Sequence, residues 1–290
     1  ESRFPLMAVE HGCIISKDAD ITVAYRVELP EVFTLTRAEY EAMHSTWVKA
    51  VKVLPEYSIV HKQDIFIEES YRPEACGEER SFLSRSFERH FNERPYLKHT
   101  CYLFLTRTTK EHSRTTSSFN ALTRGFIIPR EMRDKEAVAR FLECCGQFER
   151  IVNDSGLVRM ERLSDGEITG TGTSAGIIEK YLSLSQEGCT CLQDITIGSG
   201  EMRIGDSLLC LHTLSDPEDL PSAVGTDSRY ERLSTDRSDC RLSFAAPIGI
   251  LLTCNHIVNQ YVFIDSPAET LQKFEQTARN MHSLSRYSRS

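Results

Sequence analysis

Six cysteine and histidine side chains form three pairs whose members are separated by one residue. On a strand, residues i and i+2 point to the same face, so each pair could present two soft ligands to a zinc ion. However, a C-x-C pair on a flat strand wraps an ion poorly, and cysteine is among the most buried residue types. We therefore expect core thiols and no metal. The pairs are Cys189 and Cys191, Cys210 and His212, and Cys254 and His256.

A glycine-rich segment from Gly170 to Gly176 fits two short catalytic patterns, the dinucleotide turn G-x-G-x-x-A and the nucleophile elbow G-x-S-x-G. In the second pattern Ser174 would be the nucleophile. Both patterns must follow a buried strand, and the preceding residues LSDGEIT are too polar to form one. A loop in which Ser174 or Thr173 caps a helix beginning at Ile177 is therefore favoured. The candidate bases for Ser174 would be His212, His256 and His282.

The nucleotide-binding P-loop is absent from this sequence. That motif needs Gly-Lys-Ser/Thr, because backbone amides and the lysine hold the phosphates. None of the 15 glycines is followed by lysine. We therefore expect no catalytic residue and no cofactor in this chain.

The segment from Thr226 to Asp265 joins a half rich in arginine and aspartate to an almost wholly apolar half. Mixed signs disfavour DNA, because the carboxylates oppose the attraction to phosphate. Two interpretations stay open for the charged half: a solvated loop with local ion pairs, or the rim of a partner surface. The apolar half predicts two paired strands, Ile248–Thr253 and Gln260–Ile264. The partner surface would comprise Arg229, Arg232, Asp236, Arg237, Asp239 and Arg241.

The composition is that of an ordinary globular protein, with 40% apolar and 26% charged residues in a chain of 290. A net charge of −8 argues against a nucleic-acid-binding surface. No apolar run approaches the length of a membrane helix, and the first residues do not form a signal peptide. The 10 cysteines are interpreted as reduced thiols in a cytosolic compartment. Because Glu1 is not an initiator methionine, we interpret the chain as a fragment.

Apolar periodicity and capping signals predict a β-β-α-β-α-β-α order in the first half. This order predicts an α+β fold with mixed or antiparallel sheets, helices packed on one face and ferredoxin-like elements. A boundary near Gly156 would give two subdomains, 1–155 and 156–290. The predicted strands are Cys13–Ser16, Ile21–Leu29, Tyr57–Glu68, Cys101–Leu105, Val158–Leu163, Cys189–Ile197 and Leu208–Leu214, and the predicted helices begin near Thr36, Leu83, Asp134, Ile177 and Ser266.

Six segments resemble the N-terminal part of the TraG family, the conjugation ATPases of Bacteroides-type conjugative transposons. They read ESRFPL, GCIISKDADITV, SFLSRSFERHFNERPYL, YERLSTDRSDCRLSFAAP, CNHIVNQYVFID and RNMHSLSRYSRS. The resemblance implies a cytoplasmic module, peripheral at the inner membrane, that precedes a P-loop motor domain for type IV secretion. The implied partners are the chain's own C-terminal ATPase domain, inner-membrane secretion components and a second copy of itself.

Two other classes of function remain as alternatives. A stand-alone hydrolase would use Ser174 or the cysteine and histidine pairs as a serine, thiol or metal enzyme. A weak single-stranded DNA-binding module would use the loop from Thr106 to Arg124 and the arginine-rich tail. Nucleic acid is the least favoured of these partners because the chain is acidic.

Overall fold

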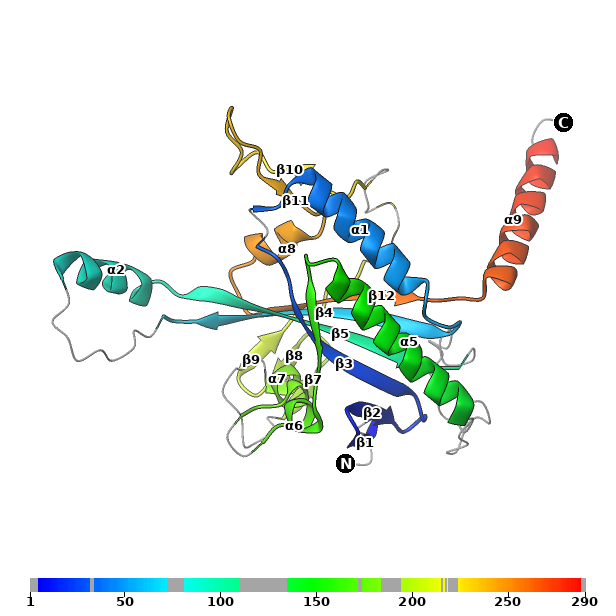
Figure 1. The fold of residues 1–290 in the computed structure, drawn as a ribbon, viewed down its shortest axis with the longest axis horizontal. Coiled ribbons are helices and arrows are strands. Elements are labelled where there is room, and N and C mark those ends of the chain that lie inside the picture. Colours follow the sequence, from blue (N-terminus) through cyan, green and yellow to red (C-terminus); the bar gives the residue numbers. More distant parts are fainter. Residues whose placement is uncertain are drawn as a thin grey trace.

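The computed structural model describes residues 5–31, 34–71, 81–109, 135–171, 174–183, 194–214, 216, 218 and 224–287. A seven-stranded sheet forms its centre, with the strand order β1-β2-β3-β5-β4-β12 and β6 beside β3 (Figure 1). Every strand pairing in this sheet is antiparallel. The strands are β1 (Leu6–Glu10), β2 (Cys13–Ser16), β3 (Ile21–Glu28), β4 (Ser58–Glu69), β5 (Tyr96–Arg107), β6 (Arg159–Arg162) and β12 (His256–Phe263).

The central unit runs β3-α1-β4-β5-α5-β6, and its strands lie in the order β6-β3-β5-β4. Here α1 spans Arg37–Val51 and α5 spans Lys135–Asp154, and α2 (Phe82–Asn92) lies between β4 and β5. The two long helices pack side by side on one face of the sheet (Figure 1). This arrangement confirms the predicted α+β class with antiparallel strands and ferredoxin-like elements.

Local sequence signals place both of these helices. The hydroxyl of Thr36 accepts a hydrogen bond from the backbone N–H of Glu39, and the Glu39 carboxylate accepts one from the N–H of Thr36 at 2.7 Å. This is the predicted capping box. At the other helix, Gly156 lies two residues beyond α5 with φ at +69°, a backbone conformation that favours glycine.

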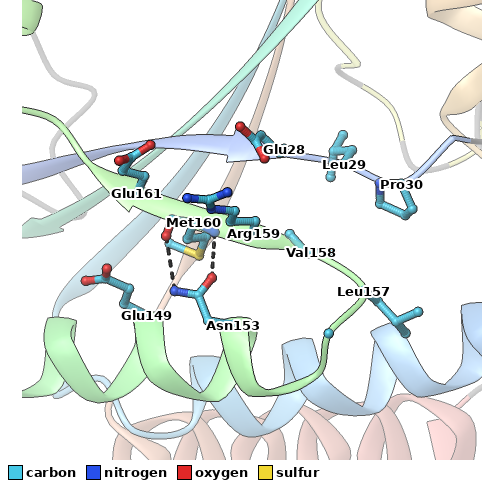
Figure 2. A pocket seen from close by; sticks show the side chains of 11 residues that line it. Glu28, Leu29, Pro30, Glu149, Asn153, Leu157, Val158, Arg159, Met160 and Glu161 are labelled. Carbon is cyan, nitrogen blue, oxygen red and sulfur yellow. Dashed lines mark hydrogen bonds between the residues drawn. The ribbon is translucent and has the colours of Figure 1, made fainter.

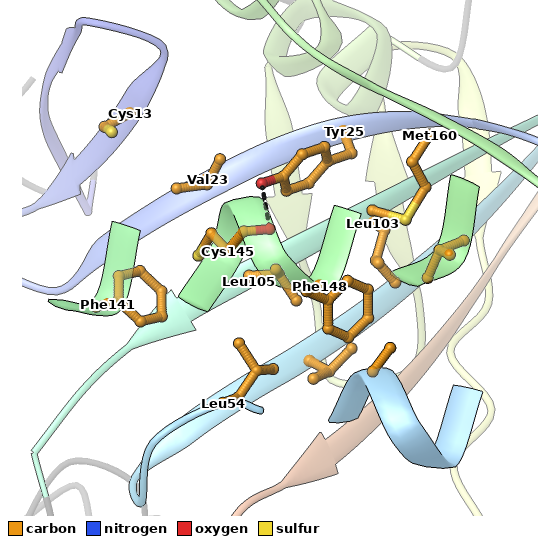
Figure 3. Close-up of a cluster of buried hydrophobic side chains, with 13 residues drawn as sticks. Cys13, Val23, Tyr25, Leu54, Leu103, Leu105, Phe141, Cys145, Phe148 and Met160 are labelled. Carbon is orange, nitrogen blue, oxygen red and sulfur yellow. Dashed lines mark hydrogen bonds between the residues drawn. The ribbon is translucent and has the colours of Figure 1, made fainter. Parts of the chain in front are cut away.

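The main core lies between the sheet and these two helices (Figure 3). Phe141 and Phe148 of α5 are fully buried against strand residues such as Val23 and Leu105. The ring of Phe148 meets the ring of Trp47 of α1 edge-on, with 5.7 Å between centroids. Tyr25 donates its hydroxyl hydrogen to the carbonyl oxygen of Cys145 at 3.4 Å, so the polar atom in this apolar layer is satisfied.

The opposite face of the sheet carries a second, smaller core. Helices α6 (Asp165–Thr169) and α7 (Ile177–Ser183) contribute Ile168 and Ile177, which are grouped with Ile65 and Tyr102 of the sheet. The predicted helix beginning at Ile177 is therefore confirmed. Helices α1 and α5 lie on one face as predicted, but α6 and α7 cover the opposite face, so the prediction that the helices pack on one face is wrong for these two.

The predicted hairpin between Ile248–Thr253 and Gln260–Ile264 is wrong. Residues Ala246–Leu251 form a short helix, α8, and β12 pairs with β4 instead. Pro247 lies in the first turn of α8, where its missing N–H costs nothing and its fixed φ favours the helix. Gly249 lies directly against the ring of Phe66, because a Cβ atom there would be 2.5 Å from Phe66 Cζ.

Three very short strands form a separate antiparallel sheet: β7 (Ile195–Ile197), β8 (Met202–Ile204) and β9 (Ser207–Leu209). The predicted strand Leu208–Leu214 is thus much shorter than expected, and residues 210–214 are not in a strand. The predicted strand Cys189–Ile197 begins outside the described residues, and its end coincides with β7. In these strands Ile195, Ile197 and Leu208 are exposed, whereas Ile204 of β8 is buried.

The expected division at Gly156 falls inside the main sheet. Strand β6 pairs with β3 and β12 pairs with β4, so residues on both sides of Gly156 form one sheet. The final predicted helix is present as α9 (Pro267–Tyr287), beginning after Ser266. It extends away from the sheet (Figure 1).

The outer edge of β6 is closed by a side chain. The Asn153 amide donates to the carbonyl oxygen of Met160 at 3.1 Å and accepts from its N–H at 2.6 Å (Figure 2). This asparagine of α5 therefore satisfies the backbone groups that a further strand would use. A surface cleft of about 680 Å³ lies here, lined by polar residues such as Glu149 and Arg159 and by apolar ones such as Leu29 and Val158.

Replacing Phe148 by alanine should lower the free energy of unfolding by about 3–5 kcal/mol, because a fully buried ring leaves a cavity. Urea unfolding can be followed by the fluorescence of Trp47, the one tryptophan of the chain. The matched control is Phe274→Ala, since Phe274 is 68% exposed. That control should change stability by less than about 0.5 kcal/mol. Equal losses in the two variants would contradict this assignment of the core.

Candidate interaction surfaces

The charged half of the 226–265 segment folds into a small hairpin. Strands β10 (Ser228–Arg229) and β11 (Arg241–Leu242) pair antiparallel. Arg241 bridges Asp227 at 2.7 Å and Asp239 at 3.5 Å, and Arg229 lies 3.4 Å from Asp239. Half of the predicted surface residues, Arg229, Asp239 and Arg241, are therefore held in ion pairs within the hairpin.

The base of the hairpin is fixed to the core unit. Leu242 is fully buried, and Cys240, two residues earlier, is also buried. The Tyr40 hydroxyl of α1 donates a hydrogen bond to the carbonyl oxygen of Arg241 at 3.1 Å. The hydrogen bond from Arg241, together with its charge, lowers the pKa of Asp227 although desolvation opposes this. The hairpin base is thus an ordered platform, and the segment is more than a solvated loop.

The tip of the hairpin carries the other predicted residues. Arg232, Asp236 and Arg237 are exposed, and they form no ion pair within the described part of the chain. Leu233 lies among them and is 51% exposed. A charged tip with one apolar residue on an anchored base is the arrangement expected of an interface rim.

The apolar stripe of α2 is a second candidate interaction surface, and the sequence did not predict it as a surface. Leu83, Phe87 and Phe91 recur every four residues and therefore share one side of the helix. The sequence predicted the helix correctly, but α2 lies at the end of a long arm built by β4 and β5 (Figure 1). None of its residues is buried, and Leu83 and Phe87 are 77% and 62% exposed. The apolar spacing alone does not distinguish a helix that faces the core from one that faces a partner.

The cysteine and histidine pairs do not converge in the part of the chain that the structure describes. Cys210 and Cys254 are exposed, so the expectation of core thiols is wrong for these two. His212 is also exposed, and Cys189 and Cys191 lie outside the described residues. The Nδ1 atom of His256 lies 2.7 Å from the carbonyl oxygen of Cys254, and its ring stacks on Phe66 at 4.5 Å. Among the described residues, no group of three or more potential ligands is arranged to hold a metal ion.

Ser174 is exposed, and its hydroxyl oxygen lies 2.9 Å from that of Thr171. None of His212, His256 and His282 hydrogen-bonds to it in the described structure. The helix start is instead held by Glu179, whose carboxylate accepts a hydrogen bond from the N–H of Gly176. Gly170 and Gly176 touch closely, because a Cβ on Gly176 would be 2.2 Å from the Gly170 nitrogen. The glycines thus serve a tight loop between α6 and α7, and Thr173 lies outside the described residues.

A polar cluster on β4 and β5 was also missed by the sequence reasoning. The buried Asp64 carboxylate forms an ion pair with Lys62 and lies 2.8 Å from His99 Nε2. Burial would raise the pKa of Asp64, but hydrogen bonds from His99 and Lys62 and the charge of Lys62 lower it below its ordinary value. The contact between Asp64 and His99 could not be read from the sequence, because it forms only through the register of β4 with β5.

This cluster borders a cavity of about 470 Å³ beneath α1. Trp47 and Leu103 supply apolar walls, and Lys62, Cys101 and Gln260 supply polar atoms. Burial raises the pKa of the Cys101 thiol well above its usual range, and burial raises that of Cys145 to about 12. These thiols stay protonated near neutral pH, whereas a nucleophilic cysteine needs a lowered pKa.

Comparison with known proteins gives one partial match. A family model described as "Domain of unknown function, B. Theta Gene description (DUF3875)" matches residues 1–45. No curated protein matches the chain. In the described residues, no helix combines the length and apolar character needed to cross a membrane.

Replacing Asp64 by asparagine should lower the free energy of unfolding near neutral pH by about 1.5–3 kcal/mol, because charged hydrogen bonds are lost. The wild-type carboxylate stabilises the fold fully above its unfolded pKa of about 3.9. Since its folded pKa is lower, this stabilisation disappears as the pH falls through the folded value.

The D64N variant should therefore lose less stability than wild type between about pH 4 and pH 2. Urea unfolding at a series of pH values measures this. Asp236→Asn at the exposed hairpin tip is the control and should follow wild type. Parallel pH profiles for D64N and wild type would show that Asp64 is not the titrating group.

Proposed function

We propose that this chain is a non-catalytic assembly and docking domain of a conjugative-transfer type IV secretion ATPase. In this role it links a C-terminal P-loop motor to components of the inner-membrane transfer complex, from the cytoplasmic side. The resemblance of six segments to the TraG family supports this function. The family described as DUF3875 has no stated activity, and it matches only the first part of the chain.

The exposed face of α2 is the observation that carries the proposal. Three large apolar side chains on one side of a helix are normally buried against a core. Here they stand at the end of an arm, where Phe91 contacts Phe87 and Tyr71 at 4.5 and 6.3 Å between ring centroids. Exposed apolar patches of this kind mark sites of protein interaction. A helix with anchors at i, i+4 and i+8 fits a hydrophobic groove on a partner.

The hairpin tip supplies a second, polar contact. Arg232 and Arg237 are long cationic side chains on a base that is anchored to α1 through Tyr40. Charges at an interface rim chiefly set partner selection and association rate, whereas buried apolar anchors supply most of the affinity. The two surfaces therefore have different expected roles: α2 holds the partner and the hairpin selects it.

The chemistry of the described residues supports a non-catalytic role. The sequence has no P-loop, and the thiols of Cys101 and Cys145 are buried with raised pKa values. The hydroxyl of Ser174 contacts the hydroxyl of Thr171, which is not a general base. A purified chain that turned over ATP above the background would contradict the proposal.

Phe87→Glu should abolish capture of an inner-membrane transfer component in a pull-down from cells that express the remaining transfer proteins. A charge in the centre of the apolar stripe would have to be desolvated on docking. Asn92→Glu adds the same charge on the opposite side of α2 and is the matched control. Unchanged capture by F87E, with circular dichroism showing a folded protein, would remove α2 from the interface.

Reversing both tip arginines, Arg232→Glu with Arg237→Glu, should slow association by about tenfold or more at low salt and have a smaller effect at high salt. Surface plasmon resonance with the captured partner separates the association rate from the dissociation rate. The control is Arg150→Glu with Arg203→Glu, which makes the same change in net charge elsewhere. Equal slowing in both double variants would show that only net charge matters.

A further inference from the structure

Three strands, β1, β6 and β12, lie at the ends of the main sheet in the described structure, and two of them are protected against pairing. Strand β1 is five residues long, and its register with β2 shifts between Leu6 and Ala8. Strand β6 is four residues long, and Asn153 binds both outward-facing backbone groups of Met160 (Figure 2). A short strand, a bulge and a covering side chain are recognised ways of blocking an edge.

The third edge, β12, has none of these protections. It is eight residues long, and all eight pair with β4 without a register shift. Its sequence, HIVNQYVF, contains no lysine, arginine, aspartate, glutamate or proline. Residues 259–263 are all exposed, and no strand of the described chain pairs with the outer edge. A long, regular, uncharged edge is a template for pairing with another strand.

A row of stacked rings leads across the sheet to this edge. Phe104 of β5 stacks on His61 of β4 at 5.1 Å, and His61 stacks on Tyr261 of β12 at 4.2 Å between centroids. These residues are direct partners in the strand register. Across the strands the row ends at Tyr261, which is 54% exposed, and no further strand of the described residues lies beyond it.

We propose that β12 pairs antiparallel with β12 of a second copy of this chain, with the two-fold axis close to Tyr261. In such a pair the two Tyr261 rings lie opposite each other and continue the row of rings through both copies. Asn259 of each copy then lies opposite Phe263 of the other. The two sheets become one continuous sheet, and the exposed edge disappears.

The lack of charge on β12 favours a second copy over an unrelated strand. In an antiparallel pair with its two-fold axis at Tyr261, that residue faces its own copy, and residue 259 of each copy faces residue 263 of the other. A lysine or glutamate at 261, or two like charges at 259 and 263, would therefore face a like charge. No residue of β12 is a lysine, arginine, aspartate or glutamate, so the pair has no repulsion between like charges. The inference goes beyond the proposed docking function and does not need it, because it rests on the sheet edge alone.

Sedimentation velocity over a concentration series tests the pairing with the intact chain. Wild type should show a reversible monomer–dimer equilibrium. Tyr261→Lys should raise the dimer dissociation constant by more than about tenfold, because like charges face each other and the aromatic contact is lost. The matched controls are Phe87→Lys on α2 and Phe274→Lys on α9, which place the same charge on the other exposed apolar surfaces.

Phe263→Lys is a second variant on the same face of β12, and it should act like Y261K. Circular dichroism and Trp47 fluorescence show whether each variant is folded. If Y261K does not fold, F263K is used to test the pairing. A wild-type chain that stays monomeric at all concentrations would overturn the proposal. So would a dimer that survives both β12 variants, or one that is lost in F87K or F274K instead. Capture of a transfer component by a monomeric chain would overturn the pairing and leave the docking function standing.

Discussion

The antiparallel ladder between β4 and β5 is the constraint on which the rest of this structure depends. It runs without interruption from the Ser58–Arg107 pair to the Glu69–Tyr96 pair. Because neighbouring side chains alternate between faces, this one register decides which residues reach the core under α1 and α5 and which reach α6 and α7. It also brings Asp64 beside His99, supplies the edge that β12 joins, and continues beyond the core as the arm that carries α2.

The helices and strands of the central unit could be predicted because their signals are local. Thr36 and Glu39 cap α1 whatever the rest of the chain does, and Gly156 lies beyond the end of α5 for a backbone reason. The ferredoxin-like order followed from the alternation of these elements. The strand predicted for Ile248–Thr253 was wrong because a short apolar run is equally compatible with a strand and with a buried helix. Pro247 in the first turn and the contact of Gly249 with Phe66 favour the helix. The second of these joins residues far apart in the sequence, so it could not be predicted from the local pattern.

The candidate interaction surfaces show the same limit. The charge pattern of residues 226–241 left two interpretations open, and it did not indicate that ion pairs form at the base of the hairpin while the charges at its tip stay exposed. The stripe of α2 predicted a helix but not its exposure, because exposure depends on how far the β4–β5 ladder extends from the core. Asp64 looked like an unremarkable strand residue, since its partner His99 is 35 residues away in sequence.

The apolar surface that remains outside the core needs a physical explanation. Neither buried cluster of the described chain includes a residue of α2, and β12 contributes to the smaller cluster only through the partly buried Ile257. Phe87, Tyr261 and Phe263 therefore add little to the stability of a lone chain, yet they expose large apolar areas to water. Unprotected surface of this kind lowers solubility in isolation, whereas the edge of β6 is closed by Asn153 in the same sheet. The contrast between a closed edge and an open one within one sheet is best explained if the open surfaces are covered by other chains when the protein is assembled.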